Sequence, residues 1–297
     1  MASDELVSVI EILRAQPVAD GVTVEEMRSG MEALIGNAPL PEGASIEDVD
    51  VDGVPGAWVT ADGAADDKVV LYLHGGGYAI GSIKTHRALA ANISKAVGVR
   101  VLLIDYRLAP EHPHPAAVDD AVTAWKWLLA QGLAPANMAI SGDSAGGGLT
   151  FATLLALRDQ GLPLPACAVP ISPWVEMEAI SDSHTTRAEV DPMVHSDGLK
   201  RMADWYLNGI DVKTPLAAPL HADLRGLPPI FVQVGDAEVL LDDATRIVEK
   251  AKAAGVDATC EVIPDGIHVL HAFAPLVPEA NDAIDRLAAF MRQHLPS

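Results

Sequence analysis

Six short segments of the chain are runs of mainly apolar residues, a pattern typical of strands buried on both faces of a parallel sheet. The runs occupy residues 69–73, 99–104, 138–141, 166–171, 230–234 and 259–263. Between them, and after the last, apolar positions recur with helical spacing at residues 85–97, 116–131, 145–160, 239–254 and 278–293. This alternation predicts a mostly parallel central sheet flanked by helices on both faces. Such a sheet binds its ligands beyond the carboxyl ends of its strands.

Two regions depart from this alternation. Residues 1–35 have the spacing of two short helices broken near residues 17–21, and alternating sequence at residues 46–51 and 57–60 then predicts antiparallel strands. Residues 174–216 contain one helical stretch, 196–207, in an otherwise irregular insertion. We expect one domain over residues 1–297. Long irregular insertions in such domains often act as lids, so these two regions are expected to form a cap over the site. This helical cap would comprise about residues 1–40 and about residues 175–216.

Composition narrows the class of partner. The 297 residues are 49% hydrophobic and 21% charged, and 41 acids against 20 bases give a formal net charge of −21. That charge argues against binding to nucleic acid or anionic membranes, which favour basic surfaces. The apolar runs fall short of the ~18 residues that a membrane span needs, so we expect no membrane insertion. The first residues carry acids where a secretion signal needs basic charge, which favours a cytoplasmic location.

The sequence Gly142-Asp-Ser-Ala-Gly146 lies between an apolar run and a helical segment. This is the strand–turn–helix setting of the G-x-S-x-G nucleophile elbow, in which the central serine hydroxyl is exposed on a strained turn. The two glycines remove side chains that would collide in the turn. We therefore predict that Ser144 is a catalytic nucleophile. The segment has neither the G-x-G-x-x-G register nor the lysine of a nucleotide-binding loop.

Three consecutive glycines follow the first buried run, in His74-Gly-Gly-Gly-Tyr78. Glycines at a strand end are expected where backbone approaches a ligand closely. Their N–H groups, together with that of Ala145, are suited to stabilise the oxyanion of a tetrahedral intermediate.

A serine nucleophile needs a base and an acid that orients the base. His268 follows the last strand-like run and precedes the last helix, and His271 lies three residues later. The acid should follow the run at residues 230–234, where the candidates are Asp236, Glu238, Asp242 and Asp243. This arrangement gives the chain order serine, acid, histidine of α/β-hydrolases.

Other candidate residues have simpler interpretations. His112 and His114 could begin a metal site, but no further ligands stand at a suitable spacing, so we expect no metal. Arg107 and Glu111 lie in a proline-containing turn, Asp105-Tyr-Arg-Leu-Ala-Pro-Glu-His-Pro113, and are interpreted as structural charged groups.

The glycine triplet, the turn at residues 105–113 and the elbow occur together in an order that resembles the bacterial hormone-sensitive-lipase family of carboxylesterases. The resemblance runs from about residue 45 to the C-terminus. It implies an α/β-hydrolase fold with an N-terminal cap, no cofactor, and hydrolysis of neutral esters with short to medium acyl chains. Carried over by motif, the catalytic residues are Ser144, Glu238 and His268, and the oxyanion N–H groups are those of Gly76, Gly77 and Ala145.

The acid is the one departure from the family pattern, which usually has aspartate before Pro-Leu-x-Asp. This chain reads Glu238-Val-Leu-Leu-Asp242, so Asp236 stays an alternative to Glu238. Two alternative functions also stay open, a ligand-binding protein on the same fold and an amidase or lactonase. The expected partner is a small-molecule ester, and the oligomeric state, including whether the chain forms a homodimer, is left open.

Overall fold

A computed structural model, which describes residues 2–15 and 21–296, contains one eight-stranded sheet. Its strand order is β1-β2-β4-β3-β5-β6-β7-β8. Only β2 runs antiparallel to its neighbours, β1 and β4, and all other pairs are parallel. The strands are β1 (Ser45–Val51), β2 (Val54–Thr60), β3 (Ala65–Leu73), β4 (Val99–Ile104), β5 (Met138–Asp143), β6 (Cys167–Ile171), β7 (Ile230–Gly235) and β8 (Ala258–Ile263).

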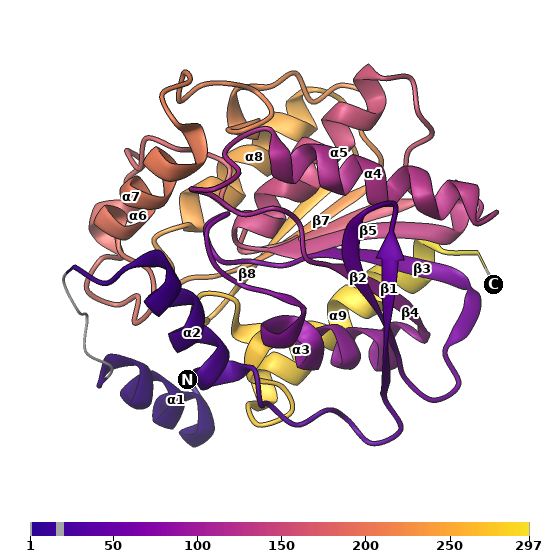
Figure 1. Ribbon diagram of the computed structural model, residues 1–297. Helices are drawn as coiled ribbons and strands as arrows, with labels where there is room; N and C mark the ends of the chain where they lie inside the picture. Colours follow the sequence, from indigo (N-terminus) through magenta and orange to yellow (C-terminus); the bar gives the residue numbers. More distant parts are fainter. Residues whose placement is uncertain (1, 16–20, 297) are drawn as a thin grey trace.

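Helices cover both faces of this sheet (Figure 1). The main helices are α3 (Ile83–Val97), α4 (Ala116–Ala130), α5 (Ala145–Asp159), α8 (Leu241–Ala253) and α9 (Pro278–His294). Buried residues of α4, α5 and α8 form one hydrophobic cluster with the sheet, whereas those of α3 and α9 form another on the opposite face. The predicted mostly parallel sheet with helices on both faces is confirmed.

Strand β3 shows why the apolar runs are continuous. Val69, Leu71 and Leu73 belong to the cluster on the α4 and α5 side, and Val70 and Tyr72 belong to the cluster on the α3 and α9 side. Because successive side chains of a strand point to opposite faces, a strand covered on both faces needs apolar residues at every position.

The two regions that broke the alternation lie at one end of the sheet (Figure 1). The first contains α1 (Asp4–Arg14) and α2 (Val24–Ile35), and the insertion contains α6 (Ser183–Thr186) and α7 (Ser196–Leu207). The expected break near residues 17–21 falls mostly outside the described residues. Helix α1 is attached to α9, because the N–H and hydroxyl of Ser3 donate to the Glu279 carboxylate at 2.7 and 2.8 Å. None of the described helices is long and apolar enough to cross a membrane.

Candidate active site

Ser144 lies between β5 and α5 in a strained turn, with φ 54° and ψ −119°. The two flanking glycines are required by close packing. A side chain at Gly146 would overlap the carbonyl oxygen of Leu73 in β3, and one at Gly142 would overlap that of Gly146. The turn therefore holds Ser144 at the carboxyl end of the central strands, and the first turn of α5 follows it directly.

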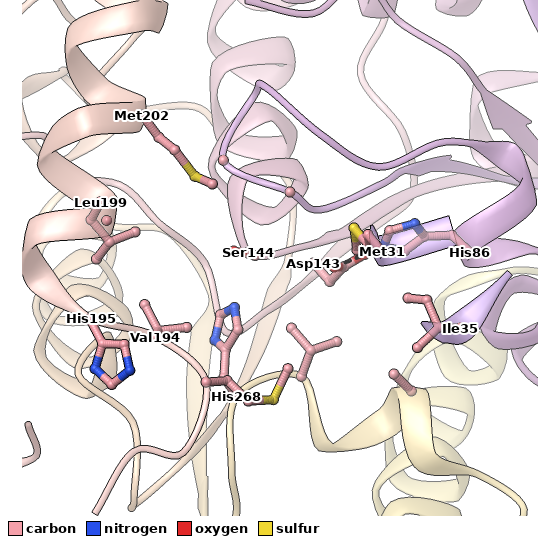
Figure 2. A pocket seen from close by; sticks show the side chains of 16 residues that line it. Met31, Ile35, His86, Asp143, Ser144, Val194, His195, Leu199, Met202 and His268 are labelled. Atoms are coloured by element: carbon pink, nitrogen blue, oxygen red, sulfur yellow. Dashed lines mark hydrogen bonds and ion pairs between the residues drawn. The ribbon is translucent and has the colours of Figure 1, made fainter. Parts of the chain in front are cut away.

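His268 follows β8, and its imidazole is directed toward Ser144 (Figure 2). Its Nδ1 lies 2.8 Å from Oε2 of Glu238, which follows β7. Both side chains are buried. Burial alone would lower the pKa of His268, but the hydrogen bond to Glu238 and its negative charge outweigh burial, so the pKa is raised above its ordinary value. The chain thus brings Ser144, Glu238 and His268 together from three separate loops.

Two further hydrogen bonds fix the Glu238 carboxylate. Its Oε1 accepts from the hydroxyl of Ser172 at 2.7 Å and from the backbone N–H of Gly235 at 2.6 Å. The Ser172 oxygen also accepts from the N–H of Val269, beside His268, at 3.2 Å. Sequence reasoning did not identify Ser172, although it directly follows β6 at the ligand-binding edge of the sheet.

The other candidates for base and acid have different surroundings. Asp236 is half-buried, and its backbone N–H donates to the carbonyl of Ile263 at 3.0 Å. His271 is buried with its Nε2 2.9 Å from Oε1 of Gln233, and burial lowers its pKa to about 3. His271 therefore stays neutral, and its ring contacts Gln233 of β7 rather than the Glu238 carboxylate.

The glycine loop after β3 presents backbone donors to the same place. Gly76 and Gly77 have φ of 116° and 60°, in the left-handed region that favours glycine. In the part of the chain that the structure describes, the N–H groups of Gly76, Gly77 and Ala145 donate to no protein acceptor. The arrangement is suited to stabilise an oxyanion beside Ser144.

A buried polar network lies behind this loop. The Tyr72 hydroxyl donates to Oδ1 of Asp143 at 2.8 Å, and His86 Nε2 is 3.3 Å from both Oδ2 of Asp143 and the N–H of Gly75. Burial opposes the charged imidazolium, but the Asp143 charge raises the pKa of His86. The network joins the elbow to the glycine loop. His86 was not singled out from the sequence.

A cavity of about 220 Å³ opens beside Ser144 and His268 (Figure 2). Both regions of the expected cap contribute to its wall. The first region provides Met31 and Ile35 from α2, and the insertion provides mainly apolar residues, namely Met193, Val194, His195, Gly198, Leu199 and Met202. Tyr206 of α7 packs instead against Tyr78, with ring centroids 3.7 Å apart.

The charged turn at residues 105–113 has the structural role expected for it. Arg107 forms an ion pair with Asp120 at 2.7 Å. Glu111 pairs with Arg28 of α2 at 2.7 Å, and Arg28 Nε also donates to the carbonyl of Ala79 in the glycine loop at 2.8 Å. These contacts connect α2 to the loop that carries the candidate oxyanion donors.

Comparison with known proteins agrees with this geometry. A family described as alpha/beta hydrolase fold matches residues 70–272. An acetyl-hydrolase of Streptomyces hygroscopicus is 43% identical over 98% of this chain and 97% of its own length. A carboxylesterase of Mycobacterium tuberculosis is 35% identical over 75% of this chain and 73% of its own. A solved esterase from the bacterial hormone-sensitive lipase family has a TM-score of 0.97 at 49% identity, with both chains covered completely.

Proposed function

Because this chain belongs to the bacterial hormone-sensitive-lipase family of α/β-hydrolases and is a carboxylesterase, we propose that it hydrolyses neutral esters with short to medium acyl chains through Ser144, His268 and Glu238. The observation that carries the assignment is the buried 2.8 Å hydrogen bond between Glu238 and His268, whose imidazole is directed toward the elbow serine. The N–H groups of Gly76, Gly77 and Ala145 form the oxyanion site in this proposal.

The proposed reaction has two halves. Ser144 Oγ attacks the ester carbonyl while Nε2 of His268 takes the hydroxyl proton, and Glu238 stabilises the resulting imidazolium. The three N–H groups stabilise the oxyanion of the tetrahedral intermediate. The alcohol leaves with the proton from His268, and an acyl group remains on Ser144. Water then gives its proton to His268 and attacks the acyl group, which releases the carboxylic acid and free Ser144.

The proposed range of acyl-chain lengths is inferred from the size and lining of the cavity. Its volume is about 220 Å³, and its wall is mainly apolar, with side chains from α2, α7 and the segment just before α7, which favours a short, uncharged acyl group. The net charge of −21 disfavours anionic substrates. The relative that is 43% identical is named an acetyl-hydrolase, which also supports a short acyl chain.

A series of p-nitrophenyl esters from acetate to palmitate tests this range. We expect kcat/KM to be highest between acetate and hexanoate and to fall steeply toward laurate and palmitate. Met31→Ala, which opens the cavity wall, should move the optimum to a longer chain. Met27→Ala, on the same helix but outside the cavity lining, serves as the matched control and should leave the optimum unchanged. A wild-type optimum at palmitate would contradict the proposal.

A further inference from the structure

A cluster of buried acidic and imidazole groups lies away from Ser144, at the base of the insertion. Oxygen and nitrogen atoms of Glu176, His184 and Asp243 all lie within 4.8 Å of one another. The three residues are 1%, 6% and 0% exposed, respectively. They come from three parts of the chain. Glu176 lies in the segment after β6, His184 is in α6 and Asp243 is in the first turn of α8.

One ring nitrogen of His184 has a hydrogen-bond partner and the other has none. Nδ1 lies 3.1 Å from the Ser196 hydroxyl. When Nδ1 donates to that hydroxyl, Nε2 carries a lone pair. That Nε2 has no hydrogen-bond partner among the described residues and lies 3.9 Å from Oδ1 of Asp243.

Asp243 presents a second acceptor to the same space. Its Oδ2 accepts from the N–H groups of Val175 and Glu176 at 2.9 and 3.0 Å, whereas Oδ1 has no partner within the described chain. A separation of 3.9 Å is too long for a direct hydrogen bond between Oδ1 and Nε2. A buried imidazole nitrogen and a buried carboxylate oxygen, both without a hydrogen-bond partner, are together suited to bind one cation.

The charge of the cluster points the same way. Within residues 2–15 and 21–296, no lysine or arginine forms an ion pair with Glu176 or Asp243. Backbone N–H groups donate to both carboxylates, but these hydrogen bonds do not neutralise their charge, and a buried carboxylate is stabilised further by a cation.

We propose that Glu176, His184 and Asp243 form a binding site for a divalent first-row transition-metal ion such as Zn²⁺. One imidazole nitrogen and two carboxylate oxygens are ligands that Zn²⁺ accepts, whereas Ca²⁺ and Mg²⁺ prefer oxygen alone. Zinc–ligand bonds of about 2.1 Å place tetrahedral ligands about 3.4 Å apart. Nε2 of His184 and Oδ1 of Asp243, which are 3.9 Å apart, therefore need to approach by only about 0.5 Å, and the Glu176 oxygen starts within 4.8 Å of both. Ser196 orients the imidazole from the side opposite the ion, as partners of metal-binding histidines usually do.

The ion would join the insertion to the sheet. Ser183, next to His184, already donates through its N–H to Asp242 at 2.8 Å and through its hydroxyl to the carbonyl of Val239 at 2.6 Å. A metal at this position would cross-link α6 to α8 close to the loop that carries Glu238. It should therefore stabilise the folded protein by mass action.

The test is titration of Zn²⁺ into the full chain after chelator treatment, by isothermal calorimetry. Absorption bands of bound Co²⁺ report directly on the ligand set. We expect one ion per chain and a higher Tm with Zn²⁺. Asp243→Asn, which retains an acceptor for Val175 and Glu176, and His184→Gln should each weaken binding by at least about 100-fold. His112→Gln removes an exposed histidine and should bind as the wild type does.

Cooperative thermal unfolding of the metal-free variants establishes that they fold, and if Asp243→Asn does not fold, His184→Gln decides the question. The proposal is wrong if the wild type shows no saturable binding, or if binding survives both substitutions. It is also wrong if His221→Gln abolishes binding and His184→Gln does not, because the ion would then lie in the neighbouring group of Glu176, Glu178 and His221. Since the ligands are distinct from Ser144, Ser144→Ala should bind Zn²⁺ normally, and this result separates the metal site from the esterase proposal.

Discussion

Glu238 is a glutamate at a position where the family pattern usually has aspartate. The extra methylene places its carboxylate within 2.8 Å of His268 Nδ1, and Ser172 and Gly235 hold the other carboxylate oxygen. The alternative acid, Asp236, is two residues earlier and belongs to the end of β7 by its backbone hydrogen bond to Ile263. At the residue scale, Glu238 is proposed as the acid because its carboxylate contacts the His268 imidazole.

Paired amide substitutions test that choice. Glu238→Gln keeps the shape but removes the charge that stabilises imidazolium, so we expect turnover of p-nitrophenyl acetate to fall by about 10³–10⁴-fold. Asp236→Asn should cost at most about tenfold, through an indirect electrostatic effect. Steady-state kinetics of the two variants measure both losses. The reverse order of losses would make Asp236 the acid.

The pH dependence of kcat/KM tests the base. His268 must be neutral to take the serine proton, and the Glu238 charge raises its pKa. Activity should therefore fall on the acid side with an apparent pKa above the ordinary value of ~6.5. Glu238→Gln should move this inflection downward.

His86 also has a raised pKa and faces the same cavity, so it needs a control. His86→Gln should lower activity through the glycine loop but retain the acid-side inflection. A wild-type profile that stays flat between pH ~5 and ~8, the range in which histidine changes charge, is incompatible with His268 as the base.

At the element scale, buried runs and helical spacing predicted the strands and main helices because the core requires those patterns. The predicted strand at residues 69–73 corresponds to the buried end of β3, whereas its exposed start, from Ala65, lacks the apolar signal. The short helix α6 was missed because its four residues carry no periodicity. Ser172 and His86 were missed for a different reason, since their roles depend on partners 66 and 57 residues away.

The elbow offers a test of element packing. Gly146→Ala would push its methyl group into the Leu73 carbonyl and separate α5 from β3, so we expect a loss of about 1–3 kcal/mol or more in unfolding free energy. Gly30→Ala in α2 meets open space and is the matched control, with an expected change of zero to about 1 kcal/mol of stabilisation. Urea unfolding of both variants measures the difference. Equal stabilities would show that the glycine is not required by packing.

At the scale of the whole molecule, the cap remains a prediction, and the cavity shows which residues of the expected cap face the site. Helix α2 provides Met31 and Ile35 to the cavity wall, and its Arg28 contacts the glycine loop, whereas α1 is attached to α9. Segments far apart in sequence thus enclose one cavity, and only a folded chain reveals which of their residues face it.

Deletion of residues 1–35 tests the cap. We expect a less active enzyme with weaker discrimination between acyl chains and a greater tendency to aggregate, because cavity and α9 surfaces become exposed. Deletion of residues 1–15 alone is the control, since it leaves α2 in place, and it should retain the acyl-chain preference. If the longer deletion leaves that preference unchanged, the first region is not part of the cap.

The most direct test of the account is to locate the acyl group during turnover. Wild-type enzyme mixed with p-nitrophenyl acetate and quenched in acid within one turnover should carry an acetyl group on the peptide that contains Ser144, as seen by peptide mass spectrometry. Ser144→Ala should remain folded, carry no acetyl group and lose at least about 10⁴-fold in kcat. An acetyl group on another residue, or substantial turnover by Ser144→Ala, would contradict the assignment of Ser144 as the nucleophile.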